Sequence, residues 1–322
     1  MHDLIKNLFI KHFGNRILNE QSDAAIVHAG SDQIAFTTDS FVIDPIFFPG
    51  GDIGKLAVCG TVNDLAVSGA YPRFISVSFI IEEGFPLKDL ELIVKSLADE
   101  ARKAKVIIVT GDTKVVNKGK CDKLFINTAG IGMLREKNRL ISQARNIKAG
   151  DLILINGTVG DHGMAVMNAR ESFNFKAQVV SDCASLHMLI CKVLDHSSLV
   201  KFMRDPTRGG VATVLNELAG KINLGIEIDE SDLPISNGVK AMCEILGYDP
   251  LYIANEGKVL MVAGKKEGMH ILDIMKKDKL GKQSAVIGRI VSDHPGKVAL
   301  RTVTGGKRII DSLAGDPLPR IC

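Results

Sequence analysis

The fold of the first half of this chain is decided by IGKLAVCGTVNDLAVSGA, residues 53–70. Apolar residues recur in this stretch at the i, i+3, i+4, i+7 spacing of a helix with one buried face. They are Ile53, Leu56, Ala57 and Gly60. Asn63 and Asp64 continue the same face, so a helix over 53–70 would present an amide and a carboxylate on its inward side.

Strand-length apolar runs alternate with further helical patterns outward from this helix, which indicates mixed α/β structure. The first half is predicted as strands 33–38, 73–81, 106–110 and 123–134 and helices 53–70 and 86–105. The second half is predicted as strands 152–155, 225–228, 258–263, 285–291 and 297–303 and helices 162–171, 181–196, 209–220, 237–247 and 267–277. We therefore expect two unlike α/β domains, over 1–145 and 146–310. A mobile tail over 311–322 would follow, because Pro317 and Pro319 have no backbone donor.

The composition is that of a globular protein. Of 322 residues, 46% are hydrophobic and 24% are charged, and 40 basic residues against 37 acidic ones leave a net charge of +3. The two signs are interspersed, so no basic surface for nucleic acid is indicated. Every apolar run is far shorter than the ~20 residues that cross a bilayer, and the N-terminus has no secretion-signal pattern. We expect a cytoplasmic protein whose partners are neither nucleic acid nor membrane.

The six cysteines show neither a CxxC pair nor the His/Cys spacing of a zinc site. Cys59, Cys191 and Cys243 lie inside apolar helical patterns, where a free cysteine packs as a small hydrophobe. Cys322 differs, because it is the last residue of the sequence and lies on the predicted tail.

Four aspartates occupy loop-like positions: Asp39, Asp64, Asp112 and Asp205. Mg²⁺ prefers a few carboxylates together with phosphate oxygens and water, so folding could assemble these residues around a metal–nucleotide complex. Each aspartate alone is explained equally well as a helix cap or turn residue.

Two glycine-rich stretches, 48–55 and 205–210, each end where a helix is predicted to begin. Exposed amides at such helix starts bind phosphate, but neither stretch matches the P-loop pattern, and a simple turn is the alternative. Glu256 precedes an apolar strand and is either a turn residue or a desolvated base. His162, in Asp161-His162-Gly163, either contacts substrate or lies at the surface of a capped helix.

Taken together, these motifs closely resemble the HypE family of hydrogenase maturation factors, over nearly the whole chain. The matching stretches are 37–40, 48–55, 59–68, 82–84, 111–115, 160–163, 205–210, 255–258 and the terminal Pro319-Arg320-Ile321-Cys322. HypE is similar to aminoimidazole ribonucleotide synthetase, selenophosphate synthetase and thiamine monophosphate kinase. The resemblance implies two unlike α/β domains, with N-terminal sheets pairing across a homodimer into a barrel.

The resemblance also implies an activity, which is ATP-dependent dehydration of a carbamoyl group on Cys322 to a thiocyanate, the source of cyanide for the [NiFe]-hydrogenase iron centre. The carbamoyltransferase HypF would load the thiol, and a HypC–HypD complex would receive the cyanide. The carried-over catalytic residues are Cys322, Glu256 and Asp64. The Mg²⁺ ligands would be Asp39, Asp64, Asp112 and Asp205, and the ATP contacts would be Asn63, Thr113, Lys114 and Gly209. We expect the HypF site or the ATP cleft to tune the reactivity of Cys322.

Two alternatives remain on the sequence alone. One is a kinase or ligase of the same superfamily acting on a free small molecule, and the other is a non-catalytic scaffold. The family's usual His-Gly-Ser-Gly-Gly stretch before the first helix is missing from the printed sequence, which opens Met1-His2-Asp3. We expect this difference to affect closure over nucleotide.

Overall fold

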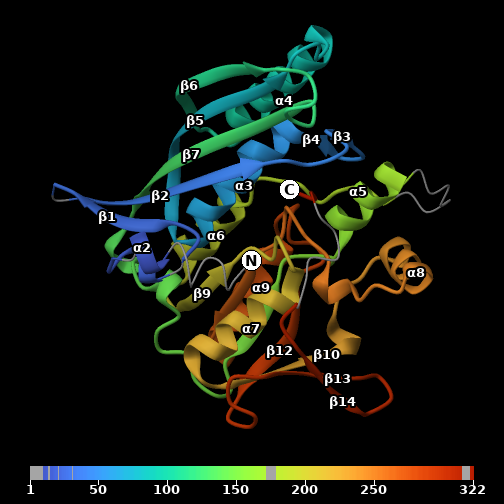
Figure 1. Ribbon diagram of the computed structural model, residues 1–322. Coiled ribbons are helices and arrows are strands. Elements are labelled where there is room, and N and C mark those ends of the chain that lie inside the picture. Colours follow the sequence, from blue (N-terminus) through green and yellow to red (C-terminus); the bar gives the residue numbers. More distant parts are fainter. Residues whose placement is uncertain (1–9, 14, 21, 31, 172–178, 314–319) are drawn as a thin grey trace.

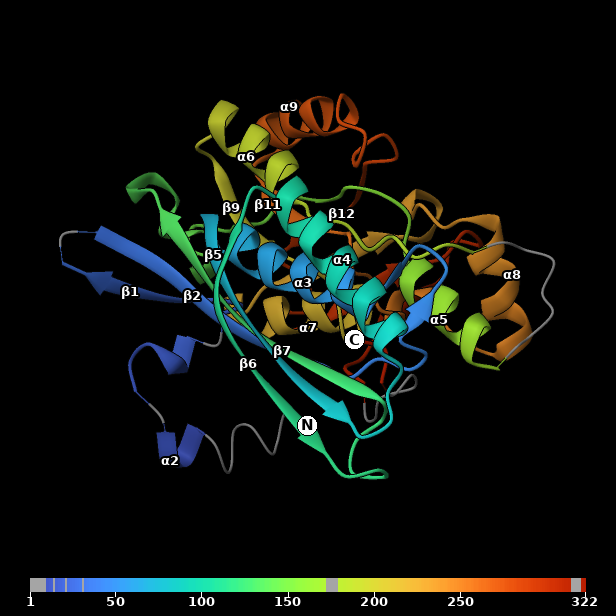
Figure 2. The same ribbon diagram turned by 90° about the horizontal axis from the view of Figure 1, so that it is seen from above.

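The N-terminal domain is built on a five-stranded sheet in the order β1-β2-β7-β5-β6. The computed structural model describes residues 10–13, 15–20, 22–30, 32–171, 179–313 and 320–322. The strands are β1 (Ala25–Ala29), β2 (Asp32–Phe41), β5 (Ala70–Glu82), β6 (Ile107–Val116) and β7 (Leu124–Leu134). Smaller elements are α2 (Lys11–Phe13), β3 (Phe47–Phe48) and β4 (Gly51–Asp52). Helices α3 (Ile53–Val67) and α4 (Leu87–Lys103) cover one face of the sheet, as Figure 2 shows from above.

Helix α3 is buried on almost every side because it lies between the sheet and the second domain (Figure 1). Only Lys55 and Asp64 among its residues are not buried, which is typical of a helix enclosed between two layers. The carboxylate of Asp52 caps its first turn, accepting hydrogen bonds from the amides of Gly54 at 2.7 Å and Lys55 at 3.2 Å. The helix ends at Val67 rather than at residue 70, because Ala70 already begins β5.

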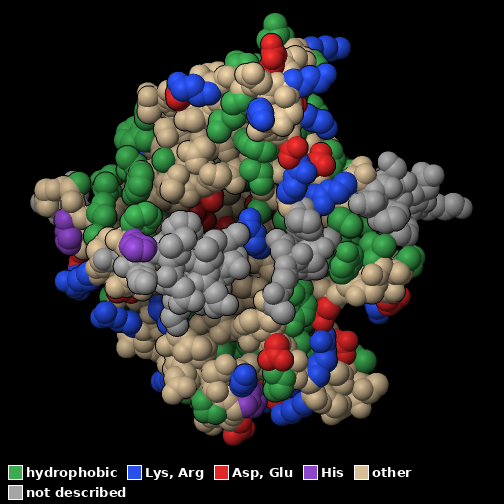
Figure 3. Space-filling view, viewed as in Figure 1, with side chains coloured by type: hydrophobic (Ala, Val, Ile, Leu, Met, Phe, Trp, Pro, Cys, Tyr) green, Lys and Arg blue, Asp and Glu red, His purple; other side chains and the backbone are tan. Residues whose placement is uncertain are grey.

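The opposite face of the N-terminal sheet carries exposed apolar side chains. Successive residues of a strand point to opposite faces, and in β5 the buried residue is Ile75, so its neighbour Phe74 points outward. Phe36 in β2 and Met133 in β7 lie on the same side and are 43% and 37% exposed. We call the residues Phe36, Phe74, Ile80 and Met133 the outer face. Hydrophobic side chains are visible over this domain in the upper half of Figure 3.

The C-terminal domain contains a mixed seven-stranded sheet in the order β14-β13-β10-β12-β8-β11-β9. Its strands are β8 (Leu152–Ile155), β9 (Val200–Arg204), β10 (Gly225–Asp229), β11 (Leu260–Ala263), β12 (Ala285–Val291), β13 (Val298–Arg301) and β14 (Lys307–Ile310). Its helices are α5 (Asp161–Glu171), α6 (His187–His196), α7 (Gly210–Ile222), α8 (Asn237–Leu246) and α9 (Lys265–Lys276). Alternate residues of β8 enter two cores: Leu154 packs with α6 and α9, whereas Ile153 and Ile155 pack with α7.

Several elements differ from the sequence prediction. The helix predicted over 181–196 begins only at His187, because the residues before it bridge the domains: Ser181 N donates to Pro49 O at 2.8 Å and Leu186 N donates to Asn63 Oδ1 at 2.8 Å. The loop expected around Asp112 is part of β6. Strands β1, β9 and β14 were not predicted. Within the described parts of the chain, no helix is long and apolar enough to cross a membrane.

Candidate active site

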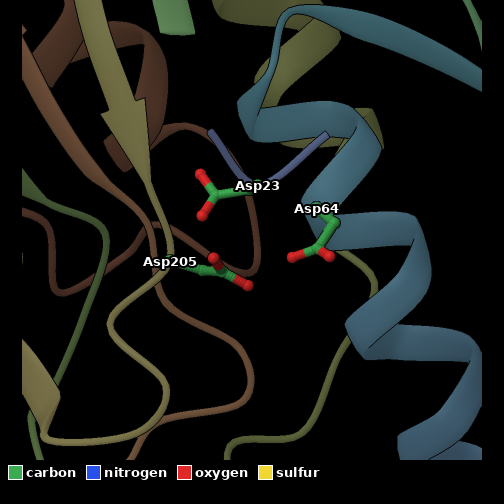
Figure 4. Close-up of side chains that lie close together, drawn as sticks. All are labelled: Asp23, Asp64 and Asp205. Atoms are coloured by element: carbon green, nitrogen blue, oxygen red, sulfur yellow. The ribbon is translucent and has the colours of Figure 1, made fainter. Parts of the chain in front are cut away.

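Three carboxylates meet between the two domains. Asp23 precedes β1, Asp64 lies in the last turn of α3 and Asp205 follows β9, and one oxygen of each lies within 4.8 Å of the others (Figure 4). Acidic side chains are visible in a hollow between the two halves in Figure 3. Asp39 of β2 is close enough to raise the pKa values of Asp64 and Asp205. The fold thus brings together three of the four predicted aspartates and adds Asp23, which was not predicted because a single aspartate before a short strand gives no distinct sequence signal.

Burial and mutual repulsion raise the pKa values of this cluster, although Arg204 pairs with Asp23 at 3.0 Å and Arg208 opposes the shift at Asp39. Burial, with the charge of Asp23 second, raises the pKa of Asp39 to about 6 and that of Asp205 to about 8. Burial also raises the pKa of Asp64, although Thr37 Oγ1 donates a hydrogen bond to it at 2.7 Å. Oδ2 of Asp205 is buried without a hydrogen-bond partner in the described structure. Such a group of hard oxygen donors fits a divalent cation, whose charge would offset the repulsion.

Glu256 adjoins the cluster on the loop before β11. Its side chain is 3% exposed, and Oε1 has no partner in the described part of the chain. Burial, followed by the charge of Asp205, raises its pKa well above the ordinary value. Of the two interpretations that the sequence left open, the structure therefore favours the desolvated carboxylate over the turn residue.

The last three residues of the chain are docked in the molecule. Asp44 N donates to Arg320 O at 3.2 Å and Val42 N donates to Cys322 O at 3.2 Å. Ile321 between them is 2% exposed, in the core cluster that contains α3. We call residues 320–322 the terminal arm. Pro317 and Pro319 lie outside the described residues, and the mobility of the tail stays a prediction.

The terminal arm places the thiol of Cys322 beside the carboxylates. Burial first, and then the charge of Glu256, raises its pKa to about 12, and Asp39 acts in the same direction. Arg208, with Nη2 at 3.9 Å from the sulfur, opposes them. The surroundings of the docked arm therefore disfavour the thiolate, and the expectation that the HypF site or the ATP cleft tunes this cysteine stays a prediction.

Asp112, Thr113 and Lys114 do not join the cluster within one chain. They lie on β6, which is separated from β2 by β5 and β7, roughly 14 Å at the usual spacing of strands. Asp112 lies opposite Ser78 in β5, two residues from Ile80 of the outer face, and is 59% exposed and paired with Lys114 at 3.0 Å. Their place on an edge strand keeps them from the other carboxylates within one chain, and the role of Asp112 as a metal ligand stays a prediction.

Asn63 and Gly209, the other two predicted ATP contacts, make structural contacts within the chain. The amide of Asn63 donates to Ala184 O at 3.1 Å and to Glu256 O at 3.3 Å, so it joins α3 to the loops of the second domain. Gly209 caps α7 at φ +73°, where an added Cβ would lie 2.1 Å from Thr213 Oγ1. Both residues flank the cluster, and their contact with nucleotide stays a prediction.

Comparison with known proteins covers both domains. Residues 21–134 match the family described as AIR synthase related protein, N-terminal domain, and residues 148–301 match its C-terminal domain. A carbamoyl dehydratase HypE from Bradyrhizobium diazoefficiens is 46% identical, over 100% of this chain and 93% of the relative. A chain in the crystal structure of a HypE–HypF complex is 48% identical, with a TM-score of 0.91 over 96% of this chain and 99% of that one. HypE in complex with ATP is 43% identical, with a TM-score of 0.87 over 100% of this chain and 96% of that one.

Proposed function

Since this chain belongs to the HypE family of carbamoyl dehydratases, we infer that it converts a carbamoyl group on Cys322 to a thiocyanate in an ATP-dependent reaction. The product supplies the cyanide ligand for assembly of the [NiFe]-hydrogenase iron centre. The observation that carries the assignment is the position of the Cys322 thiol, which shares a buried site with Glu256 and the aspartates.

Dehydration removes the carbamoyl oxygen and two nitrogen protons and leaves S–C≡N. ATP, when bound, supplies the phosphoryl group that makes this oxygen a leaving group. Glu256 has a free buried oxygen with which to accept one nitrogen proton, and the departing phosphate takes up the other. Asp23, Asp39, Asp64 and Asp205 would hold Mg²⁺.

HypF as carbamoyl donor and a HypC–HypD complex as cyanide acceptor are the partners that we propose. Support for the first comes from the HypE–HypF complex of a close relative. It also comes from the thiol, because a docked cysteine with a pKa of about 12 is a poor nucleophile and needs other surroundings for loading.

Intact-protein mass spectrometry tests the proposed function. The chain and its Cys322→Ala variant are incubated with HypF, carbamoyl phosphate and ATP. We expect a gain of about 43 Da followed by a loss of about 18 Da, only where Cys322 is present, from carbamoylation and dehydration of a cysteine. Steady ATP-dependent turnover of a soluble substrate without Cys322 would instead indicate a superfamily kinase or ligase. Absence of Mg·ATP binding would indicate a scaffold.

The proposed Mg²⁺ site predicts an unusual pH dependence. Asp39 and Asp205 have folded pKa values of about 6 and about 8, above the ordinary 3.8. A raised pKa contributes stability below the unfolded pKa, and this stability is lost as the pH rises through the folded one. We therefore expect thermal melts in EDTA to show falling stability between about pH 4 and pH 8, and excess MgCl₂ to reverse the loss.

Asp205→Asn should flatten this pH dependence and remove most of the stabilisation by MgCl₂. Asp273→Asn, which changes an exposed carboxylate on α9, serves as the control and should behave like the unsubstituted chain. Equal stabilisation by MgCl₂ in the Asp205→Asn variant would place the cation elsewhere.

A homodimer that joins the outer faces is the second assembly we propose. Exposed apolar side chains on an open sheet are typical of a protein interface, and β6 is an edge strand. Within one chain, Asp112 and Lys114 cannot reach the carboxylate cluster, so only a second copy could bring them to a site.

Phe74→Asp should weaken this dimer about 30-fold or more, because an interface anchor is replaced by a charge. Sedimentation velocity over a concentration series would show a shift from dimer to monomer. Val303→Asp replaces an apolar residue of the C-terminal domain that is 72% exposed, against 40% for Phe74, and should leave the mass unchanged. A Phe74→Asp variant that sediments as the unsubstituted chain would exclude the outer face as the interface.

A further inference from the structure

His162 is the histidine that contacts the terminal arm. It is the second residue of α5 and is completely buried. Its Nε2 lies 2.7 Å from Ile321 O and its Nδ1 lies 2.8 Å from Ser181 Oγ. The ring of Phe48 meets it edge to face at 5.4 Å. Three neighbours therefore fix the imidazole, and one of them is the peptide carbonyl directly before Cys322.

The hydrogen bonds determine which nitrogen carries the proton. A carbonyl oxygen can only accept, so Nε2 must be the donor to Ile321 O. Burial lowers the pKa of His162, which favours the neutral ring, and Nδ1 then accepts from the hydroxyl of Ser181. Ser181 is itself anchored, because its Oγ accepts from Cys183 N at 3.1 Å and its own N donates to Pro49 O at 2.8 Å.

The residue after Ser181 holds the loop of Glu256. Asp182 accepts hydrogen bonds from the backbone amides of Glu256 at 3.2 Å and Gly257 at 3.0 Å. Its charge is matched by Lys258, whose Nζ lies 2.8 Å away in a buried ion pair. Two adjacent residues of one segment therefore hold the two reacting groups: Ser181 holds the terminal arm through His162, and Asp182 holds the backbone of Glu256.

We propose that the segment Ser181-Asp182 sets the distance between Glu256 and the Cys322 thiol that carries the carbamoyl group. His162 is the positioning residue for the terminal arm. The inference rests on the proposed function. His162 does not touch the reacting atoms in this arrangement, because both ring nitrogens are engaged and the bond to the arm is made to the carbonyl of Ile321. His162 holds the carbamoylated Cys322 in the position that dehydration requires.

Single-turnover kinetics test this role. The full-length chain is first carbamoylated by HypF, and thiocyanate formation is then followed by mass spectrometry after addition of Mg·ATP. His162→Phe keeps a ring but loses both hydrogen bonds, and it should slow dehydration about 100-fold, the cost of a misplacement of about 1 Å. His162→Gln retains a donor toward Ile321 O and should recover to within about tenfold of the unsubstituted rate.

Two further measurements separate positioning from general damage. The concentration of ATP that gives half the maximal rate, and the amount of carbamoyl group loaded by HypF, should stay unchanged in both variants. His187→Gln changes another buried histidine, on α6 and away from the arm, and should dehydrate at the unsubstituted rate. If His162→Phe does not fold, Ser181→Ala replaces it and should slow dehydration about tenfold, because His162 stays in place but loses its anchor.

Dehydration at the unsubstituted rate in His162→Phe, or in Ser181→Ala where it replaces that variant, would overturn the inference alone. Equal losses in His162→Phe and His162→Gln would also overturn it, because a positioning bond should be restored by the retained donor. If neither the unsubstituted chain nor His187→Gln forms thiocyanate after loading, the proposed function is wrong and the inference falls with it.

Discussion

Glu256→Gln is expected to leave carbamoylation of Cys322 intact and to slow its dehydration by about 10² to 10⁴-fold, the usual contribution of a general base. The amide keeps the size of the side chain but cannot accept a nitrogen proton. Intact mass over time would show the carbamoyl adduct accumulating without the loss of water. Because Glu256 is buried among acidic groups that raise its pKa, it is a stronger base than an exposed glutamate once it is ionised.

Glu244→Gln is a matched control, since it makes the same change at an exposed position of α8. It should dehydrate like the unsubstituted chain. Normal thiocyanate formation in Glu256→Gln would remove this residue from the mechanism and leave the aspartates as the remaining candidates for the base.

Gly257→Ala is expected to lower the free energy of unfolding by about 3 kcal/mol, the upper range for forced overpacking. An added Cβ would lie 1.9 Å from Asp182 O and 2.9 Å from Asp182 C, both backbone atoms that no rotamer change can move. The segment that anchors the arm and the loop that carries the base would have to separate. Urea denaturation followed by circular dichroism measures the loss.

Gly220→Ala should change stability in the opposite direction, by up to about 1 kcal/mol, because Gly220 lies in α7 with no atom within 4 Å of the added Cβ and alanine favours the helix. If Gly257→Ala and the unsubstituted chain have similar urea midpoints, the segments of Asp182 and Gly257 can separate without strain, which would contradict the packing described.

The sequence was most informative where a periodic pattern and a cap coincide. Helix α3 was predicted to within three residues at its end, because apolar spacing is a local property. The grouping of Asp39, Asp64 and Asp205 was predicted through motifs from distant parts of the chain; the three lie near one another in the fold, and their binding of Mg²⁺ stays a prediction.

The incorrect predictions of local structure have a common physical cause. Contacts between residues far apart in the sequence determine the structure of these segments. The strand before Asp112 was predicted only up to residue 110, but pairing with β5 extends it to Val116, so Asp112 lies in a strand and not in a loop. Residues 181–186 have a helical pattern, yet bonds to Pro49 and Asn63 across the domains keep them out of the helix, which begins at His187. Neither competing contact is visible in a local window of sequence.

The high pKa of the docked thiol bears on oxidative damage. Peroxides attack the thiolate, and at neutral pH a thiol with a pKa of about 12 has only about one molecule in 10⁵ in that form. The cysteine on which each turnover depends is therefore shielded from sulfenic acid formation whenever it is docked between cycles. Oxidative inactivation should then fall mainly on the fraction of molecules whose arm has left the site.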